Sequence, residues 1–183
     1  MSNKWNDFGL LAIRLGVGSA LVAHGTQKLF GWFGGYGPDG TGQWMSSMGF
    51  TGDGKRNAIL AGLGEAGGGA LLALGLATGP AGAAVTGTMA VAGSTHVPNG
   101  FFNADGGFEL PATFALVGTA LALGGPGRFS LDHVLGHRLN RRWMALTGLA
   151  VTLGSAAYLI TTRVQPEPVE QEIKATEAAA DEA

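Results

Sequence analysis

Residues 8–30, FGLLAIRLGVGSALVAHGTQKLF, decide the fold. A helix that crosses the ~30 Å hydrocarbon core of a membrane needs about 20 apolar residues. This run is long enough, although Arg14, His24, Gln27 and Lys28 interrupt it. A cleaved signal peptide is the alternative interpretation. We expect a retained helix instead, because Arg14 interrupts the apolar region and the run continues beyond any plausible cleavage point.

The composition of the whole chain supports a membrane protein. The 183 residues include 33 glycines, and only 13% are charged, whereas a soluble domain has about 25% charged residues and about 7% glycine. The chain has no cysteine, which excludes disulfides, thiolate metal sites, iron–sulfur clusters and dithiol redox relays. The net charge of −2 predicts no nucleic-acid partner.

Four further apolar runs follow the first, with a tight turn predicted at residues 78–80. They cover residues 57–77, 81–97, 109–124 and 143–162, and the run at 109–124 is short for a full span. We therefore predict an all-α membrane protein, a four-helix transmembrane bundle with a fifth C-terminal transmembrane helix. The predicted units are a four-helix membrane domain (1–132), a basic inner loop (133–142), the extra hydrophobic helix (143–162) and an acidic, disordered tail (163–183).

The distribution of Lys and Arg over the loops predicts the orientation. More of these residues fall on the side of the N-terminus, and such loops usually face the cytoplasm. We therefore expect a multi-pass protein of a bacterial-type plasma (inner) membrane with a cytoplasmic N-terminus and with membrane lipids as partners. Whether residues 143–162 cross the membrane decides on which side the tail lies.

The glycines predict close packing between helices. Gly64 and Gly68 form a small-xxx-small pair, and Gly16 and Gly18 offer a smooth patch on the first helix. In lipid, helices associate through such small residues. The same surfaces would also suit a homo-oligomer, and the pattern does not separate the two.

Ionisable residues inside the apolar runs predict a site. Each costs about 2.5–3.5 kcal/mol at the centre of a span. Arg14, His24 and Lys28 fall on one stripe of the first helix, because a helix turns about 100° per residue. The expected depths place five residues in the outer half of the bundle, away from Arg14: His24, Lys28, Glu65, His96 and Glu109.

Such a group of two carboxylates, two imidazoles and an ammonium is typical of a proton relay or a polar head-group pocket. The simpler alternatives are that Lys28 extends to the membrane surface and that His96 caps the loop after it. A metal site is not expected, because the spacing of these residues does not match a ligand motif. His133 and His137 stand four residues apart among arginines, which favours a basic helix at the membrane surface.

The segments around these residues resemble the DoxX family of small membrane proteins. The resemblance covers residues 8–132 and rests on HGTQKLFGWFGG (24–35), GE (64–65), HVPNGFF (96–102), GGFE (106–109) and GPGRFSLD (125–132). It implies a four-helix membrane bundle. Some relatives are subunits of thiosulfate:quinone oxidoreductase, and others are linked to a membrane complex with a sulfurtransferase and superoxide dismutase. The run at 143–162 and the acidic tail depart from the family pattern.

The resemblance and the polar cluster together predict a quinone-linked subunit of a membrane oxidoreductase complex. In this interpretation His24 and Glu65 exchange a proton, while Lys28, His96, Asn99 and Glu109 bind the quinone. A soluble redox partner would supply the electrons, so it stays open whether the chain is itself an enzyme. The alternatives are a non-enzymatic membrane anchor for soluble redox or stress proteins, and a transporter of small solutes or lipids.

Overall fold

The structure is a computed structural model and describes residues 4–164. The predicted tail lies outside these residues except for its first two positions. In chain order the elements are α1 (Lys4–Phe30), η1 (Trp32–Gly34), α2 (Gly37–Ser47), α3 (Gly54–Leu74), α4 (Thr78–His96), η2 (Val97–Asn99), η3 (Asn103–Asp105), α5 (Glu109–Gly124), α6 (Leu131–Val134) and α7 (Arg142–Thr161). The described part contains helices and no strands, as the sequence predicts.

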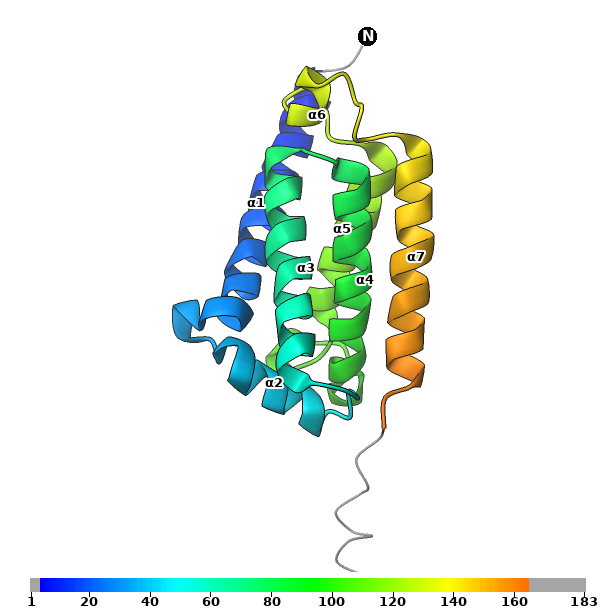
Figure 1. Ribbon diagram of the computed structural model, residues 1–183. Helices are drawn as coiled ribbons and strands as arrows, with labels where there is room; N and C mark the ends of the chain where they lie inside the picture. Colours follow the sequence, from blue (N-terminus) through cyan, green and yellow to red (C-terminus); the bar gives the residue numbers. More distant parts are fainter. Residues whose placement is uncertain (1–3, 165–183) are drawn as a thin grey trace, which may run out of the picture.

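The long helices form an upright bundle and are α1, α3, α4, α5 and α7 (Figure 1). α1 packs along α3, and α4 packs against α3, α5 and α7. The beginning of α1, the short helix α6 and the beginning of α7 lie at one end, which we call the N-terminal end (Figure 1). At the other end, which we call the α2 end, α2 crosses beneath the bundle (Figure 1). The core between the long helices includes Leu21, Leu72, Val85, Phe114 and Leu121.

Glycines set the distance between α1 and α3. A Cβ atom at Gly18 would lie 2.6 Å from the carbonyl oxygen of Gly69, and one at Gly25 would lie 2.7 Å from that of Gly62. The backbones therefore approach too closely for any side chain at these positions. The predicted Gly64–Gly68 pair packs against α4 instead, where it meets Thr88 and Val85, and Gly16 has no neighbour within 4 Å.

The prediction of a four-helix transmembrane bundle with a fifth C-terminal transmembrane helix is not confirmed in its number of membrane-spanning helices. Within the described residues, α1, α3 and α7 are long and apolar enough to cross a membrane. α5 has 16 residues, which at about 1.5 Å per residue is shorter than the ~30 Å hydrocarbon core. α4 is not among the sufficiently apolar helices. It lies inside the bundle between three other helices, so little of its surface has to be apolar toward lipid.

The run at 143–162 forms α7, which is an integral part of the bundle. It runs parallel to α4, and Gly87 of α4 accommodates Thr152, whose hydroxyl donates a 2.8 Å hydrogen bond to the carbonyl of Ala83. Beyond α7, the amide of Val164 donates to the carbonyl of Gly49 at 2.9 Å. The helix is thus attached along its length and at its C-terminal end.

The turn between α3 and α4 lies earlier than predicted. It covers residues 75–77, whereas residues 78–80, the predicted turn, form the first turn of α4. Gly75 ends α3 with φ +64°, a left-handed conformation that glycine adopts without steric cost. α4 can begin at Thr78 because a carboxylate from the distant residue Asp132 accepts the amides of Ala77 and Thr78.

Candidate functional site

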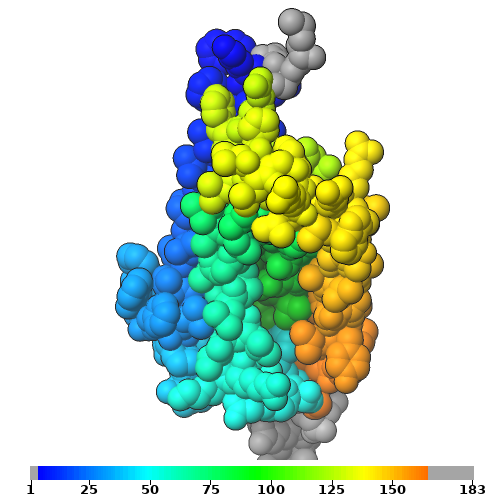
Figure 2. Space-filling view, turned by 45° about the horizontal axis from the view of Figure 1, so that its top comes forward, coloured from blue at the N-terminus to red at the C-terminus, as the bar shows by residue number. Residues whose placement is uncertain are grey.

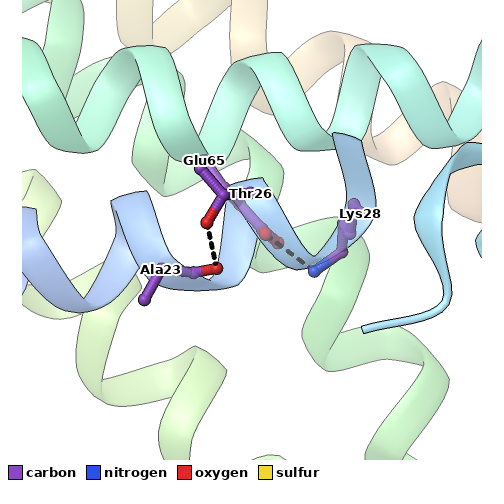
Figure 3. A network of polar contacts seen from close by, with 4 residues as sticks. All are labelled: Ala23, Thr26, Lys28 and Glu65. Carbon is purple, nitrogen blue, oxygen red and sulfur yellow. Dashed lines mark hydrogen bonds and ion pairs between the residues drawn. The ribbon is translucent and has the colours of Figure 1, made fainter. Parts of the chain in front are cut away.

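A buried ion pair joins α1 to α3. Lys28 Nζ lies 2.7 Å from Glu65 Oε2, and the two side chains point toward each other between the helices (Figure 3). The side chain of Glu65 is 3% exposed and that of Lys28 is 25% exposed. A lone buried carboxylate would be costly, and the ammonium offsets part of that cost. The structure thus pairs Glu65 with Lys28.

The close approach of the helices makes this pair feasible. Gly25 lies one turn before Lys28, and Gly62 lies one turn before Glu65. Because neither residue has a side chain, the two turns that follow are brought within reach of each other. Thr26, which lies beside the pair in Figure 3, donates its hydroxyl to the carbonyl of Ala23 at 2.8 Å and so is satisfied within its own helix.

His24 lies one turn before Lys28 on α1 and is half-buried. Its ring packs edge-on against Phe114 of α5, with 6.2 Å between the ring centroids. Residues four apart on a helix share one face, so the imidazole and the ammonium of Lys28 lie on one side of α1. The imidazole therefore faces an aromatic ring in the bundle, close to the ion pair along the helix.

The other three candidate residues organise the loop between α4 and α5. His96 Nδ1 is 2.8 Å from the carbonyl oxygen of Gly106, and the Asn99 side-chain amide donates to the same oxygen at 3.2 Å. Glu109 accepts the amide of Asn103 at 3.0 Å through Oε2. These contacts stay within residues 96–109, so the structure places these three residues in a loop network separate from the Lys28–Glu65 pair.

We expect His96→Ala to loosen this loop without unfolding the bundle. A hydrogen bond contributes about 1 kcal/mol, so the loop amides of Phe108 and Glu109, which bond to Gly100 and Phe101, should exchange with solvent about 5-fold faster. Hydrogen–deuterium exchange with mass spectrometry measures this. Unchanged exchange in 96–109 would contradict a structural role for the imidazole.

Sequence reasoning assigned no role to Asp132, which is fully buried. Its carboxylate accepts the amides of Ala77 and Thr78 at 2.8 and 2.9 Å and the hydroxyl of Thr78 at 2.8 Å. It also interacts electrostatically with Arg14. In the sequence, Asp132 stands out only as the last residue of the GPGRFSLD segment. That position does not show that its carboxylate caps a helix whose first residue, Thr78, lies 54 residues earlier in the chain.

Arg14 is separate from the Lys28–Glu65 pair, as the sequence predicts. Its side chain is fully buried, and Nη2 donates to the carbonyl of Phe129. Nε and Nη1 have no hydrogen-bond partner among the described residues. Gly75 leaves the space for the guanidinium, since a Cβ atom there would collide with Nη1. The arginine thus fastens α1 to the loop before α6.

The arrangement supports acid–base and hydrogen-bonding chemistry. The Lys28–Glu65 pair holds an ammonium next to a carboxylate, and the imidazole of His24 lies one turn earlier on α1. Among residues 4–164, no group of three or more His, Cys, Asp or Glu side chains is placed to hold a metal ion. The described site offers proton donors and acceptors.

Comparison with known proteins gives one match. The DoxX family model matches residues 9–97, which include His24, Lys28, Glu65 and His96 and end before Asn99 and Glu109. No curated protein and no solved structure matches the chain.

Proposed function

We propose that this chain, whose residues 9–97 match the DoxX family model, is a quinone-linked membrane subunit of an oxidoreductase complex. The observation that carries the proposal is the 2.7 Å ion pair between Lys28 and the buried Glu65. Ionisable residues retained within a membrane helix are costly and commonly functional. A soluble partner would deliver the electrons, since the chain has no cysteine and no cofactor motif.

The donor set suits a quinone. A quinone has two carbonyl acceptors on a flat, largely apolar ring, and its chemistry when bound is the uptake or release of electrons and protons. Lys28 remains one-quarter exposed, so its ammonium has hydrogen atoms left to donate beyond the bond to Glu65. The His24 ring can donate from the same helix face, and Phe114 beside it supplies an aromatic wall.

In this proposal each residue has a distinct task. Lys28 Nζ would donate a hydrogen bond to a carbonyl of the bound quinone, and its positive charge would stabilise negative charge there. Glu65 Oε2 accepts from Nζ and orients it, and its carboxyl group would exchange a proton with the ligand. His24 donates or accepts a second proton through its imidazole. His96, Asn99 and Glu109 keep the loop at the same end of the bundle in one conformation.

The test is the quinone content of the protein purified gently from its native membrane, measured by solvent extraction and mass spectrometry. We expect nearly one quinone per chain in the wild type and at least a 10-fold loss in Glu65→Gln, because a hydrogen bond to a charged group contributes about 1.5–3 kcal/mol. The same substitution should abolish quinone-linked activity and leave membrane insertion intact.

Asp39→Asn is the matched control. Asp39 also forms an ion pair, with Lys55 at 2.9 Å, but both side chains are largely exposed. The control should retain the quinone. Quinone retained in Glu65→Gln would contradict the assigned role.

Two other results would replace the proposal. A wild type without quinone that reproducibly retains a soluble protein would identify a non-enzymatic anchor. Uptake or export by reconstituted vesicles that is lost in His24→Ala would identify a transporter.

A further inference from the structure

The N-terminal end of the bundle contains two adjoining hollows. The first has a volume of about 360 Å³ and lies between the ends of α1, α5, α6 and α7. Its polar lining includes Arg128, His133, His137, Asn140 and Arg142. Figure 2 shows this end, where residues 125–142 (yellow-green to yellow) lie beside the beginning of α1 (blue).

No ion pair within residues 4–164 neutralises the positive charge of the arginines in this region. Among residues 4–164 the salt bridges are Lys28–Glu65 and Lys55–Asp39, so none involves the arginines of this end. The two local carboxylates have other tasks. Asp132 is fully buried and caps α4, and Asp7 accepts the backbone amide of Arg128 at 3.0 Å through Oδ1. The four arginines are Arg128, Arg138, Arg141 and Arg142.

The second hollow adds an apolar wall. It has a volume of about 500 Å³, is lined by Lys4, Phe8 and Phe129, and shares Asp7, Arg128 and His133 with the first. The rings of Phe8 and Phe129 pack together with 4.7 Å between their centroids. A basic hollow thus continues directly into an aromatic one.

From their position along the bundle, we expect both hollows to lie at the membrane boundary. α1 and α7, two of the helices that can span a membrane, begin here. Trp5 and Trp143 are exposed at these beginnings, and exposed tryptophans are typical of the level of the lipid headgroups.

From these observations we propose that the N-terminal end binds one anionic phospholipid. Arg128 and Arg142 bind its phosphate, with His133 and His137 as further donors, while Phe8 and Phe129 contact the glycerol and the beginning of the acyl chains. The charge of the hollow selects an anionic headgroup, and the adjoining aromatic wall selects a lipid over a soluble phosphate. This inference does not depend on the quinone proposal, because it concerns the opposite end of the bundle.

The probe for the test is phosphatidylglycerol with a fluorescent acyl chain, titrated into the full chain in neutral detergent. We expect Arg128→Gln/Arg142→Gln to raise the Kd about 30-fold, because each basic residue contributes about 1 kcal/mol. Arg138→Gln/Arg141→Gln is the matched control. It removes the same charge from the same end, but neither residue lines a hollow, and its Kd should change less than about 3-fold.

Competition identifies the ligand. Unlabelled phosphatidylglycerol should displace the probe, whereas phosphatidylcholine and millimolar inorganic phosphate should not. An equal loss of affinity in both double variants would show diffuse attraction and overturn the site. Displacement by phosphate alone would overturn a lipid in favour of a soluble phosphorylated ligand. Thermal unfolding checks each variant, and if the double variant is unfolded, each single substitution should still raise the Kd about 5-fold.

Discussion

Asp132→Ala is expected to lower the free energy of unfolding by about 3–5 kcal/mol, the usual cost of removing one partner from a buried polar network. Asp132 is fully buried, and its carboxylate accepts three hydrogen bonds from Ala77 and Thr78 at the beginning of α4. Its removal leaves these donors without partners and the buried Arg14 without the nearby negative charge. Unfolding in mixed micelles by increasing SDS, followed by circular dichroism, measures the change.

Two further variants separate the causes of this loss. Asp39→Ala removes an acid whose ion pair is exposed, and it should change the free energy of unfolding by less than about 1 kcal/mol. The double variant Arg14→Met/Asp132→Ala should be less destabilised than the sum of the single variants, because it no longer buries an uncompensated charge. Strict additivity would show that Arg14 and Asp132 act independently.

Gly25→Ala is expected to destabilise the bundle by about 1–3 kcal/mol, even though it adds a single methyl group. That methyl group would lie 2.4 Å from the amide nitrogen of Ala66 and 2.7 Å from the carbonyl oxygen of Gly62. Both atoms belong to the backbone, so the helices themselves must move apart. Lys28 lies one turn further along α1, and its 2.7 Å contact with Glu65 should break as well.

Gly16→Ala provides the comparison on the same helix. A Cβ atom at Gly16 has no neighbour within 4 Å, so this variant should be as stable as the wild type or up to about 1 kcal/mol more stable, because alanine favours a helix. The same SDS titration measures both variants. Equal stability of the two alanine variants would contradict the close approach of α1 and α3 at Gly25.

The sequence predicts the helices well because the local pattern determines them. The apolar run at 109–124 coincides with α5, and the run at 143–162 is displaced from α7 by one residue. The turn at 78–80 is wrong because its position depends on Asp132, which lies 54 residues beyond Thr78 in the chain. Such a distant contact leaves no trace in the residues that surround the turn.

The candidate site could be predicted only in part for a related reason. Hydropathy identifies Glu65 as a costly residue that needs a partner, and the polar stripe of the first helix offers His24 and Lys28 as candidates. Depth along the helices, however, cannot distinguish residues that face each other from residues that only share a level. His96 and Glu109 share that level, yet their contacts lie within the α4–α5 loop.

The unequal packing of the helices bears on how the protein can move. α1 and α3 share the most extensive interface, and α4 is joined more extensively to α5 and α7 than to α3. We therefore expect any movement between the helices to involve two groups, α1 with α3 and α4 with α5 and α7, that slide past each other along the α3–α4 boundary, a shear motion known from other packed helices. The ion pair travels intact within the first group, whereas the contact of His24 with Phe114 connects the two groups. Such a movement would change the surroundings of the His24 imidazole and leave Lys28 and Glu65 paired.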